Sequence, residues 1–225
     1  MKLRVPFKML CNPTPPFRVT GENAALLVMD AQRFTTQRDQ GLGARALERG
    51  IQREFQEYYE QVDAGLRNLQ KLLAACRLHG VPVIYTVLNA QEPDRSDLSR
   101  QLRLSGLPIP VNPPDYDIRP EVAPAPGERV LPRGAYSPFV GTDLLAILRE
   151  AQIDTLVLSG MMADVSLALT AEEAADCDLG VILAWDASAS QTLDWHDNMR
   201  TRLVSPLIRL RSAQQVIEMM EGSRT

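Results

Sequence analysis

Several short runs in this chain are apolar at nearly every position. Residues 24–29 read AALLVM, and residues 155–159 read TLVLS. A strand with one exposed face alternates apolar and polar residues, whereas an unbroken apolar run is typical of a strand buried on both faces of a parallel sheet. Parallel strands are joined by long crossover connections, which are usually helices. The chain is therefore expected to place helices over both faces of a parallel sheet.

The segments between the apolar runs can supply these helices. The strands are expected at 24–29, 82–87, 130–132, 155–159, 180–185 and 207–210, and the helices at 48–79, from 142, at 163–177, at 193–203 and from 213. This order predicts a three-layer α/β/α fold, doubly wound around a mostly parallel six-stranded sheet. A Pro-rich, charged segment at 89–128 interrupts the alternation, and an irregular segment of this length is typical of a lid or a connector.

The length of 225 residues suits one domain with one sizeable core. We expect this domain at 23–225, after an extended arm at 1–22 that is rich in proline. The N-terminus lacks the apolar segment of a secretion signal, and no apolar run reaches the roughly 18 residues that span a membrane. Cytoplasmic localisation without membrane contact is therefore expected.

Charge and cysteine content argue against several classes of protein. A net charge of -4 disfavours a nucleic-acid partner, which would favour clustered Lys and Arg. Cys11, Cys76 and Cys177 are widely spaced and form no CxxC pair, so we expect buried, inert thiols rather than disulfides or a zinc site. No glycine-rich phosphate loop follows a strand, so no cofactor is expected.

Ligands of open parallel sheets bind beyond the carboxyl ends of the strands. The polar residues at those positions are Asp30, Arg133, Ser166 and Asp186. From the residues alone, Asp30 is as readily a helix cap or an ion-pair partner of Arg133 as a functional group. Asp186 is interpreted as a turn or cap residue, and His196 as a helix-surface or subunit-contact residue.

Three blocks after these strands resemble the signature blocks of the isochorismatase-like hydrolase superfamily. The blocks are residues 30–32 (DAQ), residues 133–144 with Arg133, Tyr136 and Phe139, and residues 160–171 (GMMADVSLALTA), and the match extends across 22–220. The family carries an aspartate in the first block, a lysine in the second, and in the third a cysteine preceded by a cis peptide. The resemblance implies a site of Asp30, Arg133 and Ser166, and a homo-oligomer.

The same resemblance implies the lining of the site. Substrate contacts are expected from Gln32, Tyr136, Phe139, Met161 and Met162, and the cis peptide is expected between the two methionines. Some relatives in this superfamily hold a metal through Asp and His after the second strand. Residues 89–94 read NAQEPD and contain no histidine, so no metal is expected.

The chain departs from the family pattern at three positions. Arg133 replaces the lysine, Ser166 replaces the cysteine, and Ala163 replaces a threonine. An aspartate with an ordinary pKa near ~3.9 is a weak base for a serine hydroxyl, which disfavours a serine amidase. An engineered cysteine-to-serine change would explain Ser166 but neither of the other two departures.

The isochorismatase branch of the superfamily needs no cysteine. Its implied chemistry protonates a vinyl ether from the aspartic acid and releases pyruvate. We therefore expect a hydrolase of a small carboxylated molecule, with Asp30 as acid or base, Arg133 as a carboxylate clamp and Ser166 as a hydrogen-bond partner. The alternatives are a noncatalytic ligand-binding or assembly protein and, last, a serine-nucleophile amidase.

Overall fold

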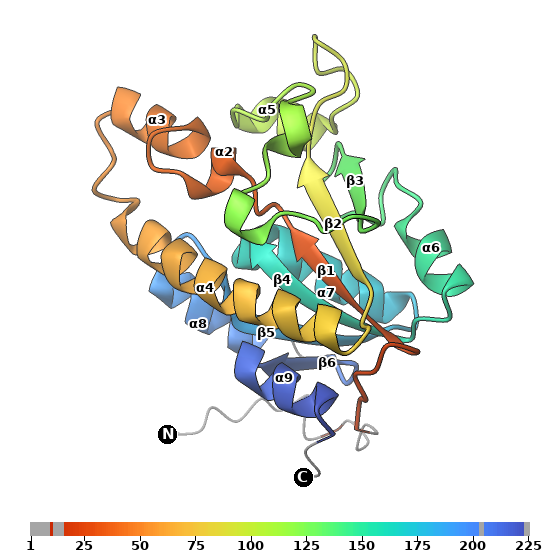
Figure 1. Ribbon diagram of the computed structural model, residues 1–225. Coiled ribbons are helices and arrows are strands. Elements are labelled where there is room, and N and C mark those ends of the chain that lie inside the picture. Colours follow the sequence, from red (N-terminus) through yellow and green to blue (C-terminus); the bar gives the residue numbers. More distant parts are fainter. Residues whose placement is uncertain (1–9, 11–15, 203–204, 223–225) are drawn as a thin grey trace.

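The computed structural model describes residues 10, 16–202 and 205–222. Six strands form one sheet in the order β3-β2-β1-β4-β5-β6, and every neighbouring pair is parallel (Figure 1). The strands are β1 Ala24–Met29, β2 Val83–Leu88, β3 Arg129–Arg133, β4 Thr155–Met161, β5 Gly180–Ala189 and β6 Ile208–Arg211. The predicted fold is confirmed.

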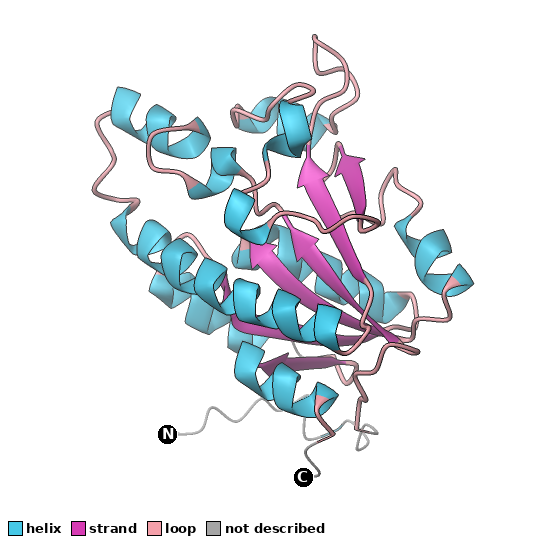
Figure 2. Ribbon diagram, viewed as in Figure 1, coloured by secondary structure: helices cyan, strands magenta, loops and turns pink. Residues whose placement is uncertain are grey.

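Helices cover both faces of this sheet (Figure 2). Their bounds are α2 Arg33–Thr36, α3 Gly41–Glu48, α4 Gln56–Leu78, α5 Arg100–Ser105, α6 Leu144–Glu150, α7 Ala168–Asp176, α8 Leu193–Arg202 and α9 Ala213–Met220; single turns lie at η1 Pro114–Asp117, η2 Pro120–Val122 and η3 Ala163–Leu167. Helices α4 and α9 pack on one face, where Leu69 and Val216 join one core cluster. Helices α6 and α7 pack on the other face through Leu148 and Ala171.

The central strand β1 explains why unbroken apolar runs predicted the sheet. All six of its residues are fully buried. Leu26 and Val28 face the α4 cluster, whereas Ala25 and Leu27 face the α6 and α7 cluster. Each fully buried Leu or Val contributes about 1.5–3 kcal/mol. A polar residue at any of these positions would therefore be costly on either face.

The single long helix predicted at 48–79 is wrong at its amino end. Helix α3 ends at Glu48, and α4 begins only at Gln56. Gly50 lies between them with φ of 68°, a left-handed conformation that ends helices and that glycine adopts without steric cost. The break frees α3 to lie beyond the carboxyl end of the sheet (Figure 1).

Strand β5 is longer than predicted. Its register against β4 shifts between Leu158 and Gly160, and Trp185 and Asp186 are half-buried at this irregularity. These residues end the apolar run, although the strand continues to Ala189. Asp186 therefore lies inside the strand rather than after it. Its carboxylate accepts a hydrogen bond from the Ala213 backbone N–H at 2.6 Å, in the first turn of α9, whose N-cap is Ser212.

Two further expectations are corrected. His196 is buried rather than on the helix surface, and its Nδ1 lies 3.1 Å from the Ser190 hydroxyl. Cys76 is buried as expected, but Cys177 is only half-buried. Both thiols are free, and Cys11 lies outside the described residues.

The segment at 89–128 is not wholly irregular. It contains α5, which Ser99 caps by accepting from the Leu102 N–H, and the left-handed Gly106 ends it. Of the expected arm at 1–22, residues 1–9 and 11–15 lie outside the described residues. Phe17 and Val19 pack against the α4 core cluster. No helix in the described part of the chain is long and apolar enough to cross a membrane.

Candidate functional site

Asp30 lies at the carboxyl end of β1, where the chain leaves the sheet. Its φ of 50° is uncommon for a residue with a side chain, and the residue is 2% exposed. The Leu88 backbone N–H donates to Oδ1 at 3.1 Å. Arg133 Nη2 donates to Oδ2. The carboxylate is therefore held from two sides at the edge of the sheet.

Arg133 is the last residue of β3 and is 1% exposed. Strand β2 separates β3 from β1, and Arg133 pairs in register with Leu88. The arginine side chain reaches past this intervening strand to Asp30. Its Nη1 donates to the Ala135 carbonyl, whereas its buried Nε has no hydrogen-bond partner among the described residues. The Nε–H is therefore a guanidinium donor that remains for another acceptor.

Ser166 lies in η3, a single wide turn that follows β4 and leads into α7. The peptide bond between Met161 and Met162, just before this turn, is cis as expected. Ser166 is 3% exposed, and its hydroxyl is close enough to Asp30 to lower the pKa of that carboxyl. The structure therefore brings together the three residues that were predicted to share a site.

Burial raises the pKa of Asp30 to about 6. The charge of Arg133, the Leu88 N–H and the Ser166 hydroxyl act in the opposite direction and limit this rise. Burial also lowers the pKa of Arg133, and the charge of Asp30 counteracts that effect. An acid with a pKa of about 6 exchanges its proton close to neutral pH, which is the property a general acid or base requires.

Gln32 is fully buried, but its amide binds the main chain. Its Nε2 donates to the carbonyls of Leu88 at 3.1 Å and Tyr116 at 2.9 Å, and its Oε1 accepts from the Leu88 N–H at 2.9 Å. The side chain thus ties the end of β2 to the η1 turn. Substrate binding by Gln32 stays a prediction.

The other expected lining residues lie at different depths. Tyr136 is half-buried, and the charges of Arg133 and Asp30 both act on the pKa of its hydroxyl, which burial raises. Met161 is fully buried in the α4 core cluster, and Phe139 packs against the α6 and α7 cluster. Met162 lines a cavity. Their roles toward a substrate remain predictions.

A cavity of about 310 Å³ lies near the site, and Asp30, Arg133 and Ser166 are not among the residues that line it. Its apolar walls are Leu42, Phe55, Tyr58, Leu107 and Met162. The Tyr58 hydroxyl donates to the Thr35 carbonyl at 2.9 Å, and the Thr35 hydroxyl donates to the Asp30 carbonyl at 2.6 Å. The charge of Asp30 raises the pKa of Tyr58, in addition to the larger effect of burial. Tyr58 in the cavity wall is therefore linked through Thr35 to the backbone of Asp30, and it lies within reach of the Asp30 charge.

Sequence reasoning missed most of these wall residues. Leu42 and Tyr58 occupy helix positions that also fit an ordinary core, and Leu107 follows a helix that was not predicted. The pair Tyr58-Tyr59 near the start of α4 is the nearest signal, because aromatic residues are common in binding pockets.

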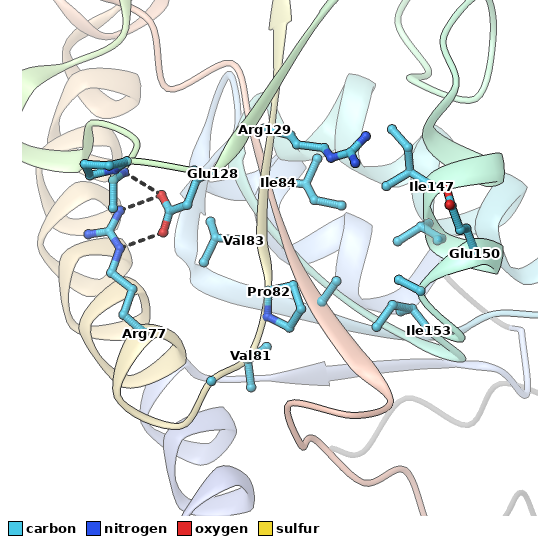
Figure 3. A pocket seen from close by; sticks show the side chains of 17 residues that line it. Arg77, Val81, Pro82, Val83, Ile84, Glu128, Arg129, Ile147, Glu150 and Ile153 are labelled. Atoms are coloured by element: carbon cyan, nitrogen blue, oxygen red, sulfur yellow. Dashed lines mark hydrogen bonds and ion pairs between the residues drawn. The ribbon is translucent and has the colours of Figure 1, made fainter.

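A second cavity, of about 620 Å³, lies at the opposite end of the sheet (Figure 3). It is lined by the start of β2 and by α6, and an ion pair between Arg77 and Glu128 at 2.8 Å stands at one side. Ligands of such sheets bind at the carboxyl ends of the strands. The smaller cavity beside Asp30 is therefore the candidate functional site.

The described residues contain no cluster of potential metal ligands. No group of three or more His, Cys, Asp or Glu side chains there could hold a metal ion. The buried donor and acceptor atoms at the site come instead from an aspartate, an arginine and a serine. Such groups can exchange a proton with a bound molecule and hydrogen-bond to it.

Among proteins of known activity, the chain is similar to an isochorismatase from Bacillus subtilis, with 33% identity over 130 residues. It is also 35% identical over 112 residues to an N-carbamoylsarcosine amidase from Arthrobacter sp. The matches cover 57% and 48% of this chain, but only 41% and 42% of the two relatives. The chain therefore spans less than half of the length of each relative.

Among solved structures, a cysteine hydrolase from Pseudomonas syringae pv. phaseolicola shares the fold with a TM-score of 0.79 and 22% identity, covering 95% of this chain and 99% of that one. An N-carbamoylsarcosine amidase from Thermoplasma acidophilum matches with a TM-score of 0.64 and 26% identity, covering 85% and 96%. The family model of the isochorismatase domain matches residues 24–215, which include Asp30, Arg133 and Ser166. The chain belongs to the isochorismatase family of hydrolases.

Proposed function

We propose that this protein hydrolyses an enol ether of pyruvate, with Asp30 as the general acid. The observation that carries the proposal is the buried carboxyl of Asp30, whose pKa of about 6 lets it hold a proton near neutral pH. The resemblance of residues 160–171 to the family's third block implies that Ser166 replaces the cysteine, and the proposed reaction uses no thiolate. The similarity to an isochorismatase supports the same chemistry.

The proposed reaction begins with proton transfer from Asp30 to the terminal CH₂ carbon of the enol ether. The electron pair of the double bond forms the new C–H bond, and the ether oxygen stabilises the resulting cation. Water adds to the cationic carbon and returns a proton to the Asp30 carboxylate. The hemiketal then separates into pyruvate and an alcohol, so one water is consumed and Asp30 is regenerated.

Arg133 and Ser166 have supporting roles in this proposal. The buried Nε of Arg133 is available to donate to the carboxylate of the enolpyruvyl group, because it has no acceptor among the described residues, whereas each Nη already donates one hydrogen bond to a protein oxygen. The charge of Arg133 also keeps the pKa of Asp30 from rising further. The Ser166 hydroxyl is a hydrogen-bond partner for substrate or for the attacking water, not a nucleophile.

The test is release of pyruvate from isochorismate and from the phenyl ether of enolpyruvate, a simpler compound with the same reacting group. We expect pyruvate from at least one of them. Asp30→Asn should abolish its release, and Ser166→Ala should leave most of it. If the wild-type protein forms pyruvate from neither compound, the proposal is wrong.

A further inference from the structure

The cavity beside Asp30 combines apolar walls with negative charge. Phe55 and Tyr58 meet edge to face, with ring centroids 6.3 Å apart, and form an aromatic side of the cavity. Leu42, Leu107 and Met162 complete the apolar walls. Such walls favour a ring or a branched hydrocarbon group and disfavour a charge that has to lose its water.

The lining of this cavity carries a negative charge and no positive one. Glu54 is exposed and lines it, and no described residue that lines it is a Lys, Arg or His. Gln191, which also lines it, donates from Nε2 to Asp164 Oδ2 at 2.8 Å. The charge of Asp164 raises the pKa of Tyr58 in the cavity wall, so this second carboxylate acts on the cavity as well. A carboxylate bound in this cavity would meet the negative charge of Glu54 on its lining and no cation among the residues that line it.

We infer that the alcohol part of the substrate is an uncharged apolar ring or branched chain without a carboxylate of its own. This inference rests on the proposed function, which assigns the one substrate carboxylate to Arg133. The cavity lined by Phe55, Tyr58 and Met162 then holds the group that leaves as the alcohol. Glu54 and Asp164 act as selectivity residues against a second negative charge.

The test compares two compounds that differ by one carboxylate. The probes are the phenyl ether of enolpyruvate and its meta-carboxyphenyl analogue, and the quantity measured is kcat/KM for pyruvate release. We expect the phenyl ether to be favoured by at least about fivefold, because two like charges a few ångströms apart repel by about 1 kcal/mol even in water. Equal values, or preference for the carboxyphenyl ether, would overturn the inference and leave the proposed function standing.

Charge substitution at Glu54 makes the test specific. Glu54→Gln should reduce the preference, Glu54→Lys should reduce it further, and both effects should weaken in high salt because exposed charges are screened. Glu48→Gln is the matched control: it removes the same charge from an exposed residue at the end of α3 that does not line the cavity. A preference that Glu48→Gln changes as much as Glu54→Gln does would contradict the role of Glu54.

Binding separates failure of the inference from failure of the proposed function. The phenyl and meta-carboxyphenyl ethers of lactate have no double bond and cannot be hydrolysed by this route. Calorimetric titration should give tighter binding of the phenyl ether, and Glu54→Gln should narrow the difference. If no pyruvate forms but this preference is found, the inference about the ligand stands and the proposed reaction is wrong. Equal affinities would overturn the inference independently of turnover.

Discussion

Arg133 reaches past strand β2 to donate a hydrogen bond to the carboxylate of Asp30. Both side chains are almost completely inaccessible, with 0% and 2% of their surfaces exposed. Burial raises the pKa of Asp30 by more than the guanidinium lowers it. The Asp30 carboxyl is therefore easier to protonate than a carboxyl group in water, even though it is paired with Arg133. This property suits a general acid, whereas a purely structural salt bridge would favour the ionised carboxylate.

The raised pKa of Asp30 should make the stability of the protein depend on pH. The pKa of Asp30 is about 6 in the folded protein and near 3.8 ordinarily, so between these values the folded state holds the proton more tightly than the unfolded state. Linkage then requires the free energy of unfolding to fall as pH rises from about 4 to 6, by on the order of 3 kcal/mol from this group. Asp30→Asn has no titrating carboxyl at this position, so its free energy of unfolding should lack this pH-dependent contribution.

The measurement is denaturant unfolding of wild type and Asp30→Asn across this pH range. The difference between the two free energies isolates Asp30, because other titrating groups are common to both proteins. We expect wild type to lose stability relative to the variant as pH rises. A difference that is constant with pH, or that changes in favour of wild type, would contradict the raised pKa.

Removing the cation should shift the pH dependence of activity. Arg133→Met leaves Asp30 buried without its guanidinium partner, so the pKa of Asp30 should rise above its wild-type value. Activity that depends on protonated Asp30 should then persist to higher pH, although kcat/KM falls because a substrate contact is lost. Arg133→Lys keeps a positive charge, so its activity should decline at a lower pH than the activity of Arg133→Met does. If the activity of Arg133→Met instead declined at a lower pH than that of wild type, the effect of the Arg133 charge on the pKa of Asp30 would be disproved.

Ser166 should be dispensable for turnover. Ser166→Ala removes the hydroxyl while keeping the turn, and we expect pyruvate release to fall by no more than about tenfold, the loss of one hydrogen bond. Intact mass spectrometry should find no covalent adduct on the wild-type protein during turnover. An adduct on Ser166, together with complete loss of activity in Ser166→Ala, would point to a serine nucleophile instead.

Gly160 should be essential for the fold at the end of β4. Its φ is 119°, and a Cβ atom there would lie 1.9 Å from the Met29 carbonyl oxygen. Gly160→Ala should therefore cost at least about 3 kcal/mol or prevent folding. Gly50→Ala is the control, since Gly50 is also left-handed but has no atom within 4 Å of its Cβ position. Thermal unfolding should show a far smaller loss for this control, about 1 kcal/mol.

The sheet could be predicted from sequence because its central strands are buried on both faces. Strand β1 is apolar at every position for that reason. The pattern failed where burial is uneven: Trp185 and Asp186 are half-buried within β5, and the predicted strand stopped there. The helix break at Gly50 was also missed, because a single glycine in a helical pattern does not show by itself that its backbone is left-handed and ends the helix.

The site was predictable only in part. Asp30, Arg133 and Ser166 each follow or end a strand, so a shared edge could be expected. The ion pair between Asp30 and Arg133 was one of the alternatives that the sequence left open, and it forms because the arginine is long enough to pass β2. The cavity walls were hidden for another reason: apolar residues such as Leu42 and Leu107 carry the same pattern whether they line a pocket or fill a core.

The pH dependence of kcat/KM for pyruvate release tests the role of Asp30 most directly. The phenyl ether of enolpyruvate is a suitable probe, because its own carboxylate is already ionised throughout the range of interest. If Asp30 is the general acid, kcat/KM should fall as pH rises through about 6, following the pKa of Asp30. Asp30→Asn should have no such limb and no measurable turnover. A rate that rises with pH through this range, or that survives in Asp30→Asn, would contradict acid catalysis by Asp30.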